Sequence, residues 1–392
     1  MPLRPTPRSS LLLVAILLVG GAACDLSGPA PGTTSGRTVY GSSGLNTALD
    51  VTPRPDGGLL VAGYAEGAPG PTDGLDSRPL FLRVDSAGAV AAATVYRDLR
   101  YGAAHGAVPF GEGLAVLVDG EGRAPASPTR HDAVLYRTDG TGTRVEVLFE
   151  ASDAFLPRQA LVPTDDGGLL LALSRAPSDT LVKLDRRGTR AWAHGLPEGQ
   201  AVTGIAEARD RTLWVLARRD ARRFTLTRLA PDGRERGRRT YGADTLRRAT
   251  ALAAVGDGVA VLQTRSVPET TRETVVVTRV SGAGAVLWRR EYAEGRLGAS
   301  SIVARPDGGL AFGYTAPRSA EGDGVGRTRA TVVWLAADGT VQRREPFGEA
   351  RRSTRVSAVA VRPDGRVVAG GATGLTGERF RSRLLVEQYR EE

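Results

Sequence analysis

Short apolar runs, each bounded by a turn signal, follow one another along most of the chain. Leu59–Tyr64 reads LLVAGY directly after RPDGG at Arg54–Gly58, and Leu310–Tyr314 reads LAFGY after a second RPDGG at Arg305–Gly309. Beyond the N-terminus, no apolar run keeps helical spacing for the length of an ordinary helix. Because Asp-Gly readily adopts the positive φ of tight hairpins, the pattern predicts many short β-strands joined by tight turns.

These turn signals define a repeat of about 50 residues with two turns in each unit. The first turn of successive units falls at Asp56–Gly58, Glu112–Gly113, Asp166–Gly168, Asp210, Asp257–Gly258, Asp307–Gly309 and Asp364–Gly365. The second turn ends at Gly88, Gly140, Gly188, Gly233, Gly284 and Gly339. The apolar runs around the turns give four strands per unit, which we name a, b, c and d in chain order. We assign a structural turn role to the full Asp-Gly-Gly copies, which are Asp56, Gly57, Gly58, Asp166, Gly167, Gly168, Asp307, Gly308 and Gly309.

Four-stranded antiparallel units repeated at this period are typical of a β-propeller, and seven units are present. The last unit ends after its c-strand, RLLVEQYREE. GRTVYG at Gly36–Gly41 resembles the d-strand ending RRTYG at Arg238–Gly242, and it precedes the first a-strand. We therefore predict an all-β, seven-bladed β-propeller with four antiparallel strands per blade. Its last blade is closed by the N-terminal strand Arg37–Gly41, which leaves no open sheet edge at the seam.

The N-terminus carries the pattern of an export signal. Basic residues precede the apolar run Leu11–Val19, and small residues lead to Cys24, the only cysteine of the chain. The apolar stretch is too short to cross a bilayer, which needs about 20 residues. GGAAC at Gly20–Cys24 resembles a bacterial lipobox. We predict a lipoprotein signal peptide over 1–23, a lipidated Cys24 with a flexible tether over 24–36, and one propeller domain over 37–392. An ordinary signal peptide with an incidental cysteine is the alternative.

Two kinds of known repeat resemble this sequence. PDGGLLVAGY at Pro55–Tyr64, followed by LFLRVDSAG at Leu80–Gly88, resembles the Asp-Gly-Gly (delta-60 or SBBP-type) repeats of bacterial envelope lipoproteins with β-propellers. LDRRGTRAW, ending at Trp192, and SGAGAVLW, ending at Trp288, resemble the repeats of quinoprotein-type propellers. The resemblance implies a protein exported and lipid-anchored at the bacterial cell envelope, with the inner and the outer membrane both open. Its motifs concern turns and strand ends, so they imply an architecture rather than an activity.

The formal net charge of +9 comes almost entirely from arginine, since Lys183 is the only lysine. The arginines are scattered, with local clusters at Arg218–Arg223 and Arg234–Arg239. A nucleic-acid site combines a basic stripe with stacking aromatic residues, and this pattern is not present in the sequence. We therefore expect no nucleic-acid partner, and we expect a monomer that meets the membrane only through its lipid anchor.

The sequence contains few groups suited to catalysis. There is no cysteine after Cys24, and the three histidines, His105, His131 and His194, have no spacing typical of metal ligands. The acidic loops Pro71–Ser77 and Glu321–Gly326 hold only part of a calcium ligand set. We predict no catalytic residue, no metal site and no cofactor.

The long connections suggest where a ligand binds. In a propeller the b–c and d–a connections share one face, and the a–b and c–d turns share the other. The long b–c connections, Ala65–Arg78, Asp119–Arg130, Thr315–Arg329 and Thr373–Arg381, belong to neighbouring blades. We expect a protein or carbohydrate partner on that face, because binding groups are often carried by loops on a rigid scaffold. A non-enzymatic binding or scaffold lipoprotein is the first hypothesis. The alternative is a propeller enzyme acting on an extracellular sugar or small molecule, with or without the assistance of a metal.

The lipoprotein hypothesis predicts that Cys24→Ala abolishes lipid attachment and blocks processing between Ala23 and Cys24, because the thiol of Cys24 is the only one in the chain. Metabolic labelling with a radioactive fatty acid, followed by gel electrophoresis, measures both effects. Secretion of an unmodified wild-type protein would show that Cys24 is incidental.

Overall fold

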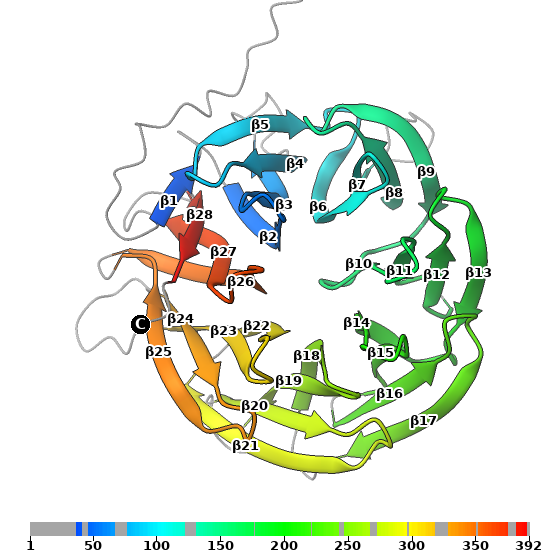
Figure 1. Cartoon of the computed structure of the whole chain (residues 1–392), viewed down its shortest axis with the longest axis vertical. Coiled ribbons are helices and arrows are strands. Elements are labelled where there is room, and N and C mark those ends of the chain that lie inside the picture. The colour runs from blue at the N-terminus through cyan, green and yellow to red at the C-terminus, as the bar shows by residue number, and fades with distance from the viewer. Residues whose placement is uncertain are drawn as a thin grey trace, which may run out of the picture.

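The computed structural model describes residues 37–40, 46–66, 77–121, 131–175, 177–220, 222–242, 247–266, 273–295, 298–317, 328–349, 352–374 and 382–389. Within these residues, seven four-stranded antiparallel sheets stand around a central axis (Figure 1). The chain is thus an all-β, seven-bladed β-propeller, as the repeat predicts. No helix of the described residues is long and apolar enough to cross a membrane. The predicted signal peptide, Cys24 and the tether lie outside the described residues.

The a-strand of each blade lies nearest the axis (Figure 1). Blades 1 to 7 begin with β2 (Asn46–Pro53), β6 (Arg100–Phe110), β10 (Leu161–Pro163), β14 (Ala201–Glu207), β18 (Arg247–Val255), β22 (Gly298–Ala304) and β26 (Ser353–Val361). The b-strands follow as β3 (Leu59–Glu66), β7 (Gly113–Glu121), β11 (Leu169–Leu173), β15 (Leu213–Arg218), β19 (Gly258–Ser266), β23 (Leu310–Pro317) and β27 (Val367–Gly374). Every residue of β11 is buried, as expected for a strand covered on both faces.

The c-strands are β4 (Ser77–Val84), β8 (His131–Thr138), β12 (Thr180–Leu184), β16 (Arg223–Leu229), β20 (Glu273–Val280), β24 (Thr328–Leu335) and β28 (Ser382–Gln388). The outer d-strands are β5 (Val90–Val95), β9 (Arg144–Ser152), β13 (Arg190–Gly195), β17 (Glu235–Gly242), β21 (Val286–Gly295), β25 (Val341–Phe347) and, for blade 7, β1 (Arg37–Tyr40). Exposed residues alternate with partly buried ones along d-strands such as β13, because one face of the outer strand meets solvent.

The three residues of an Asp-Gly-Gly turn have different structural roles. In blade 6, Asp307 Oδ1 accepts a hydrogen bond from the Gly309 N–H at 3.0 Å, which fixes the loop. Gly308 has a φ of +81°, where a side chain is strained. A Cβ on Gly309 would lie 2.4 Å from the carbonyl oxygen of Leu335 in the neighbouring c-strand. The second glycine therefore allows close backbone approach, and the first allows the turn.

The hydrophobic core is divided among the contacts between blades. The described residues contain seven apolar clusters, and each joins two successive blades. One example places Val51 and Leu59 of blade 1 against Val368 and Leu384 of blade 7. No blade has a core of its own, so each sheet is stable only against its neighbours.

Aromatic side chains at the outer strands bind each blade to the next. The hydroxyl groups of Tyr40, Tyr96, Tyr241 and Tyr292 donate to the carbonyl oxygens of Gly88, Gly142, Gly284 and Gly339, at 2.8 to 3.1 Å. Each acceptor lies in the c–d turn of the following blade. The indole N–H groups of Trp192 and Trp288 donate in the same way to Pro231 and Ala337. These aromatic residues at the d-strands thus have a structural role.

The ring closes through the predicted N-terminal strand. Arg37 pairs with Glu387 and Tyr40 pairs with Leu384 in an antiparallel β1–β28 ladder. The Arg37 guanidinium also forms an ion pair of 2.7 Å with the buried Glu387 carboxylate. Tyr40 is 5% exposed and contacts both blade 7 and blade 1. The two ends of the described chain therefore lie side by side and complete blade 7.

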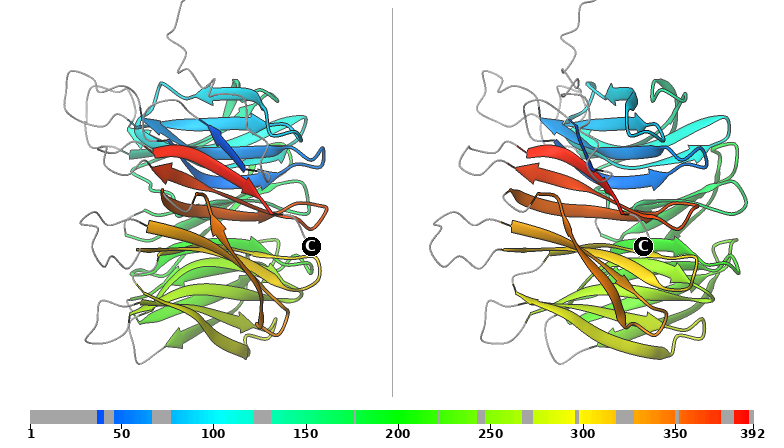
Figure 2. Two further views of the ribbon diagram at one scale, coloured as in Figure 1. Left: turned by 90° about the vertical axis from the view of Figure 1, so that its left-hand side faces the viewer. Right: turned by 60° about the vertical axis from the view of Figure 1, so that its left-hand side comes forward.

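The two ends of the strands define two faces of the disc, which Figure 2 shows from the side. The turn face carries the a–b and c–d turns, and the loop face carries the b–c and d–a connections. On the turn face, backbone hydrogen bonds close five-residue loops such as Arg54–Gly58. The expected long-loop segments 67–76, 122–130, 318–327 and 375–381 lie outside the described residues.

Removal of the closing strand should destabilise the whole ring. A chain that starts at Ser43 loses the β1–β28 ladder, the Arg37–Glu387 pair and the buried Tyr40. We expect a loss of roughly 3–5 kcal/mol, since one large buried apolar side chain alone contributes about 1.5–3 kcal/mol. Thermal unfolding compares this chain with a control that starts at Arg37 and keeps β1. Equal melting temperatures would contradict closure by β1.

The two glycines of one turn should respond differently to alanine. Gly308→Ala should cost about 1 kcal/mol through its positive φ, because its Cβ would meet nothing closer than 4.0 Å. Gly309→Ala should cost more, about 1–3 kcal/mol, because its Cβ would overlap the Leu335 carbonyl oxygen. Urea unfolding of both variants measures the difference. The reverse order would show that close approach does not determine the second position.

Candidate functional site

The inner strands share a β-bulge near the loop face. In six of the seven blades, the a–b register of the described strands shifts by one residue. The residues at the bulges are Leu49, His105, Thr203, Thr250, Ser300 and Ser357. Bulges re-aim side chains and are frequent next to functional sites.

Polar side chains of the inner strands bind the backbone of another blade. The Ser301 hydroxyl accepts from the Val359 N–H at 3.1 Å. The Gln159 amide both donates to the Leu252 carbonyl and accepts from the Leu252 N–H, and it passes over Gly204 of the intervening blade. These contacts satisfy the inner edge of the a-strands, which has no further strand to pair with.

One group of titratable side chains lies at the channel between blades 1 and 2. His105 Nε2 is 3.0 Å from Asp119 Oδ2, and both side chains are largely buried. The other oxygen of Asp119 accepts from the Ala103 N–H. Asp50 on β2 lies beside the same strand, where it accepts from the Ala107 N–H and from the Thr52 hydroxyl. The sequence gives no partner for His105, because Asp119 comes close to it only when β6 pairs with β7.

Burial raises the pKa of Asp50 to about 6, against the effect of its hydrogen bonds and of His105. The side chain is half-buried, but protein atoms surround it within the channel. An acid of this pKa gains or loses a proton near neutral pH, which ordinary aspartates do not do. Together with the His105–Asp119 pair, it gives the channel groups that can accept or donate protons.

Two arginines lie on inner segments at the loop face. Arg158 precedes β10 in blade 3, and Arg355 lies on β26 in blade 7, on the opposite side of the ring. Burial, and then the positive charge of Arg355, lower the pKa of Arg158. Neither side chain has an acidic partner among the described residues. The mouth of the channel is therefore locally positive.

A small pocket of about 320 Å³ lies on the same face between blades 4 and 5. Its charged lining consists of Arg218, Arg219, Asp220 and Arg248. The Asp220 carboxylate already pairs with Arg223 at 2.6 Å. The three pocket arginines have no ion pair among the described residues, so their guanidinium groups remain available.

A larger cavity of about 990 Å³ opens on the turn face, near blades 5, 6 and 7. Most of its arginines are already bound within the protein. Arg279 donates to the carbonyl oxygens of Val259 and Val280, Arg305 pairs with Asp307, and Arg362 donates to Gln388. These three arginines therefore stabilise the fold around the cavity.

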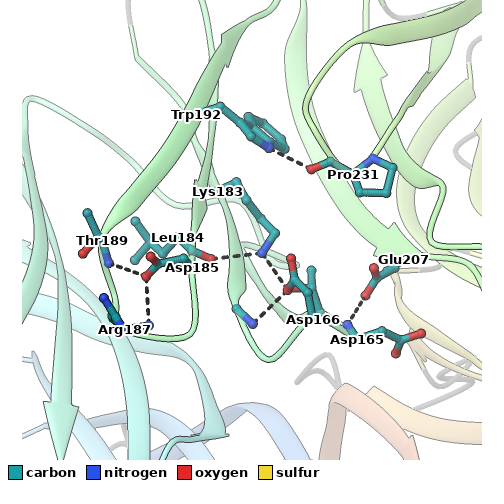
Figure 3. A network of polar contacts seen from close by, with 12 residues as sticks. Asp165, Asp166, Lys183, Leu184, Asp185, Arg187, Thr189, Trp192, Glu207 and Pro231 are labelled. Atoms are coloured by element: carbon teal, nitrogen blue, oxygen red, sulfur yellow. Dashed lines mark hydrogen bonds and ion pairs between the residues drawn. The ribbon is translucent and has the colours of Figure 1, made fainter.

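The chain's only lysine belongs to a structural network on the turn face (Figure 3). Lys183 is 3% exposed, and its Nζ donates to Asp166 Oδ1 at 2.9 Å and to the Leu184 carbonyl at 3.0 Å. Burial acts to raise the pKa of Asp166, but hydrogen bonds from Lys183, Thr164 and Gly168 outweigh it and hold that pKa at about 2. The pair joins the a–b turn of blade 3 to its c-strand.

The structure places the other predicted residues as follows. Asp56–Gly58, Asp166–Gly168 and Asp307–Gly309 all lie in a–b turns, on the face opposite the loop-face arginines. His194 is half-buried on β13, and burial lowers its pKa. His131 begins β8, but its side chain, Cys24 and nearly all of the two acidic loops lie outside the described residues. The described residues contain no group of three or more metal-ligating His, Cys, Asp or Glu side chains.

These features define a closed seven-bladed β-propeller whose loop face carries a pocket lined by three arginines. No family model matches the sequence, and no curated protein matches it. Solved structures do share the fold. The β-propeller domain of the Trilobed protease from Pyrococcus furiosus is 11% identical, with a TM-score of 0.52 over 89% of this chain and 96% of that one. The Dos1 propeller is 8% identical, with a TM-score of 0.50 over 91% and 96%.

Raptor from Chaetomium thermophilum is 10% identical, with a TM-score of 0.53, and the match covers 91% of this chain but 28% of Raptor. At identities this low, the similarity shows the fold alone. The Pyrococcus domain is described as having an open velcro topology. In contrast, the present chain pairs its first described strand with its last.

The raised pKa of Asp50 gives a pH test with a defined sign. The folded protein keeps this proton up to about pH 6, whereas the unfolded chain releases it near 3.8. Stability from this group is therefore full below about pH 4 and falls as the pH rises to about 6. Asp50→Asn should remove this fall, which amounts to at most about 3 kcal/mol for two pKa units.

Denaturant unfolding at pH 2, 3, 4, 5, 6 and 7 measures the effect. Asp166→Asn is the control of opposite sign, because its lowered pKa stabilises the fold above about pH 4 and loses that effect as the pH falls towards 2. An unchanged pH profile in Asp50→Asn would show that the carboxyl of Asp50 is solvated like an ordinary aspartate.

Proposed function

We propose that the chain is a non-enzymatic binding or scaffold lipoprotein, displayed at the bacterial cell envelope through the lipid on Cys24. The export signal, the lone cysteine after small residues and the resemblance to Asp-Gly-Gly propeller lipoproteins support this proposal. The rigid ring holds the binding surface, and the polar tether over 24–36 separates it from the membrane.

One observation carries the binding role: the strand pairs that precede the long connections all lie on the loop face of successive blades. The pairs Glu66–Ser77, Glu121–His131, Pro317–Thr328 and Gly374–Ser382 close these connections in blades 1, 2, 6 and 7. Blade 7 packs against blade 1, so the four blades form one continuous arc. A partner that is too large for the channel can contact several of these connections at once.

A second candidate is a propeller enzyme acting on an extracellular sugar or small molecule. The observation in its favour is the His105–Asp119 pair beside Asp50 at the channel. Asp119 orients the imidazole of His105, and a histidine so placed can act as a general base. Turnover of a chromogenic glycoside or ester by the wild type, lost in His105→Ala with the fold intact, would favour this candidate.

The binding proposal predicts that shortening 67–76 or 318–327 to a few glycine and serine residues removes the partner. Stability should change little, because surface loops tolerate a change in length at small cost. Affinity capture from an envelope extract, followed by mass spectrometry, compares these variants with the wild type. Shortening 267–272 in blade 5 is the matched control, and Gly308→Ala controls for the turn face. Partners retained by both shortened variants but lost in folded Gly308→Ala would show that the turn face binds instead.

A further inference from the structure

The loop face carries unpaired positive charge apart from its long connections. Arg158 lies in blade 3, Arg218 and Arg219 at the end of β15 in blade 4, Arg248 on β18 in blade 5, and Arg355 on β26 in blade 7. Each of the five side chains reaches solvent, although neighbouring protein atoms partly desolvate Arg158, and none has an acidic partner among the described residues. We refer to these five residues as the loop-face arginine cluster.

Three of these arginines share one pocket. Arg218 and Arg219 continue a buried b-strand, and Arg248 starts the inner strand of the next blade, so rigid elements bring them together. The pocket of about 320 Å³ is at the small end of the range for small-ligand sites, about 300–1,000 Å³. Asp179, from the neighbouring connection, is 5% exposed and binds the Val202 N–H and the Ser174 hydroxyl, so it does not neutralise the pocket.

The other two arginines lie on inner segments of the same face. Arg158 precedes β10 in blade 3, Arg355 lies near the start of β26 in blade 7, and the positive charge of Arg355 contributes to the lowered pKa of Arg158. Like charges repel, and a bound anion near them would relieve that repulsion. The pocket carries the inference, and this pair adds positive charge on the same face.

We propose that the loop-face arginine cluster binds an acidic polysaccharide, with one carboxylate-bearing sugar in the Arg218–Arg219–Arg248 pocket and another acidic group beside Arg158 and Arg355. This proposal goes beyond the binding function proposed above, because it places a ligand of stated chemistry on another part of the same face. A guanidinium group binds a carboxylate through two parallel hydrogen bonds, which gives both affinity and orientation. The repeated acidic groups of such a polymer suit two positive sites on one surface.

The residues favour this ligand over single-stranded nucleic acids. The lining of the pocket contains no aromatic side chain, and single-stranded nucleic acids are held largely by stacking on aromatic rings. On the turn face, the cavity of about 990 Å³ is larger, but Arg279, Arg305 and Arg362 already bind protein groups there. The three arginines of the loop-face pocket, in contrast, have no ion pair among the described residues.

Microscale thermophoresis of the full-length protein in detergent micelles tests the proposal with polygalacturonate as the probe. Arg218→Ala with Arg248→Ala should weaken binding at least tenfold, and Arg158→Ala with Arg355→Ala should do the same. The pair Arg186→Ala and Arg187→Ala removes equal charge from exposed sites of the turn face and should change affinity less than twofold. Added salt should weaken wild-type binding.

Lysine replacements separate a specific site from simple charge. Arg218→Lys with Arg248→Lys keeps the charge but loses the paired hydrogen bonds, and it should recover only part of the affinity. Equal loss in the turn-face control, or equal affinity for polyphosphate or a single-stranded oligonucleotide, would overturn the proposal. Absence of polygalacturonate binding would also overturn it. In that case, loss of an envelope partner on shortening 67–76 would still support the proposed binding function, so the two failures are distinguishable.

Discussion

The closure of the ring is the constraint on which the rest of the structure depends. The apolar clusters lie between blades, so each blade needs a neighbour on both sides. The contact between blades 7 and 1 places β2 against β26, β27 and β28, and β1 adds the outer strand of blade 7. The ring therefore gains its last interface from these strands and loses its last open edge through β1. A stable platform follows from this closure rather than from any single blade.

Closure also determines which side chains remain free for binding. Inner strands have one unpaired edge, and side chains such as Ser301 and Gln159 satisfy it across blade boundaries. On the turn face, aspartates bind the backbone of their own turns. At the loop-face mouth, Arg158, Arg248 and Arg355 lie on inner segments and have no ion pair among the described residues. The closed scaffold thus holds these guanidinium groups at fixed positions around one mouth of the ring.

The sequence predicts the fold well because hairpin turns are local. The structural roles of Asp307, Gly308 and Gly309 each depend on a few neighbouring atoms. The turn motif can therefore be recognised in the sequence. The closing strand was predictable because Arg37–Tyr40 repeats a d-strand ending. The site is different, because its contacts depend on pairing between distant strands. Nothing in the local sequence places Arg158 near Arg355, and a bulge in β6 moves His105 out of simple hairpin register with Asp119.

The net charge of +9 is the sum of charged groups whose local surroundings differ. The turn-face aspartates Asp139, Asp185 and Asp338 have lowered pKa values, because hydrogen bonds from Thr141, Thr189 and Thr340 stabilise their charged forms. They stay ionised and form a fixed negative rim beside the arginines of that face. In the loop-face pocket, hydrogen bonds from Arg222 and Arg223 also lower the pKa of Asp220, but Arg218, Arg219 and Arg248 outnumber this one acid. An acidic ligand at that pocket therefore meets a local excess of positive charge, which favours its approach.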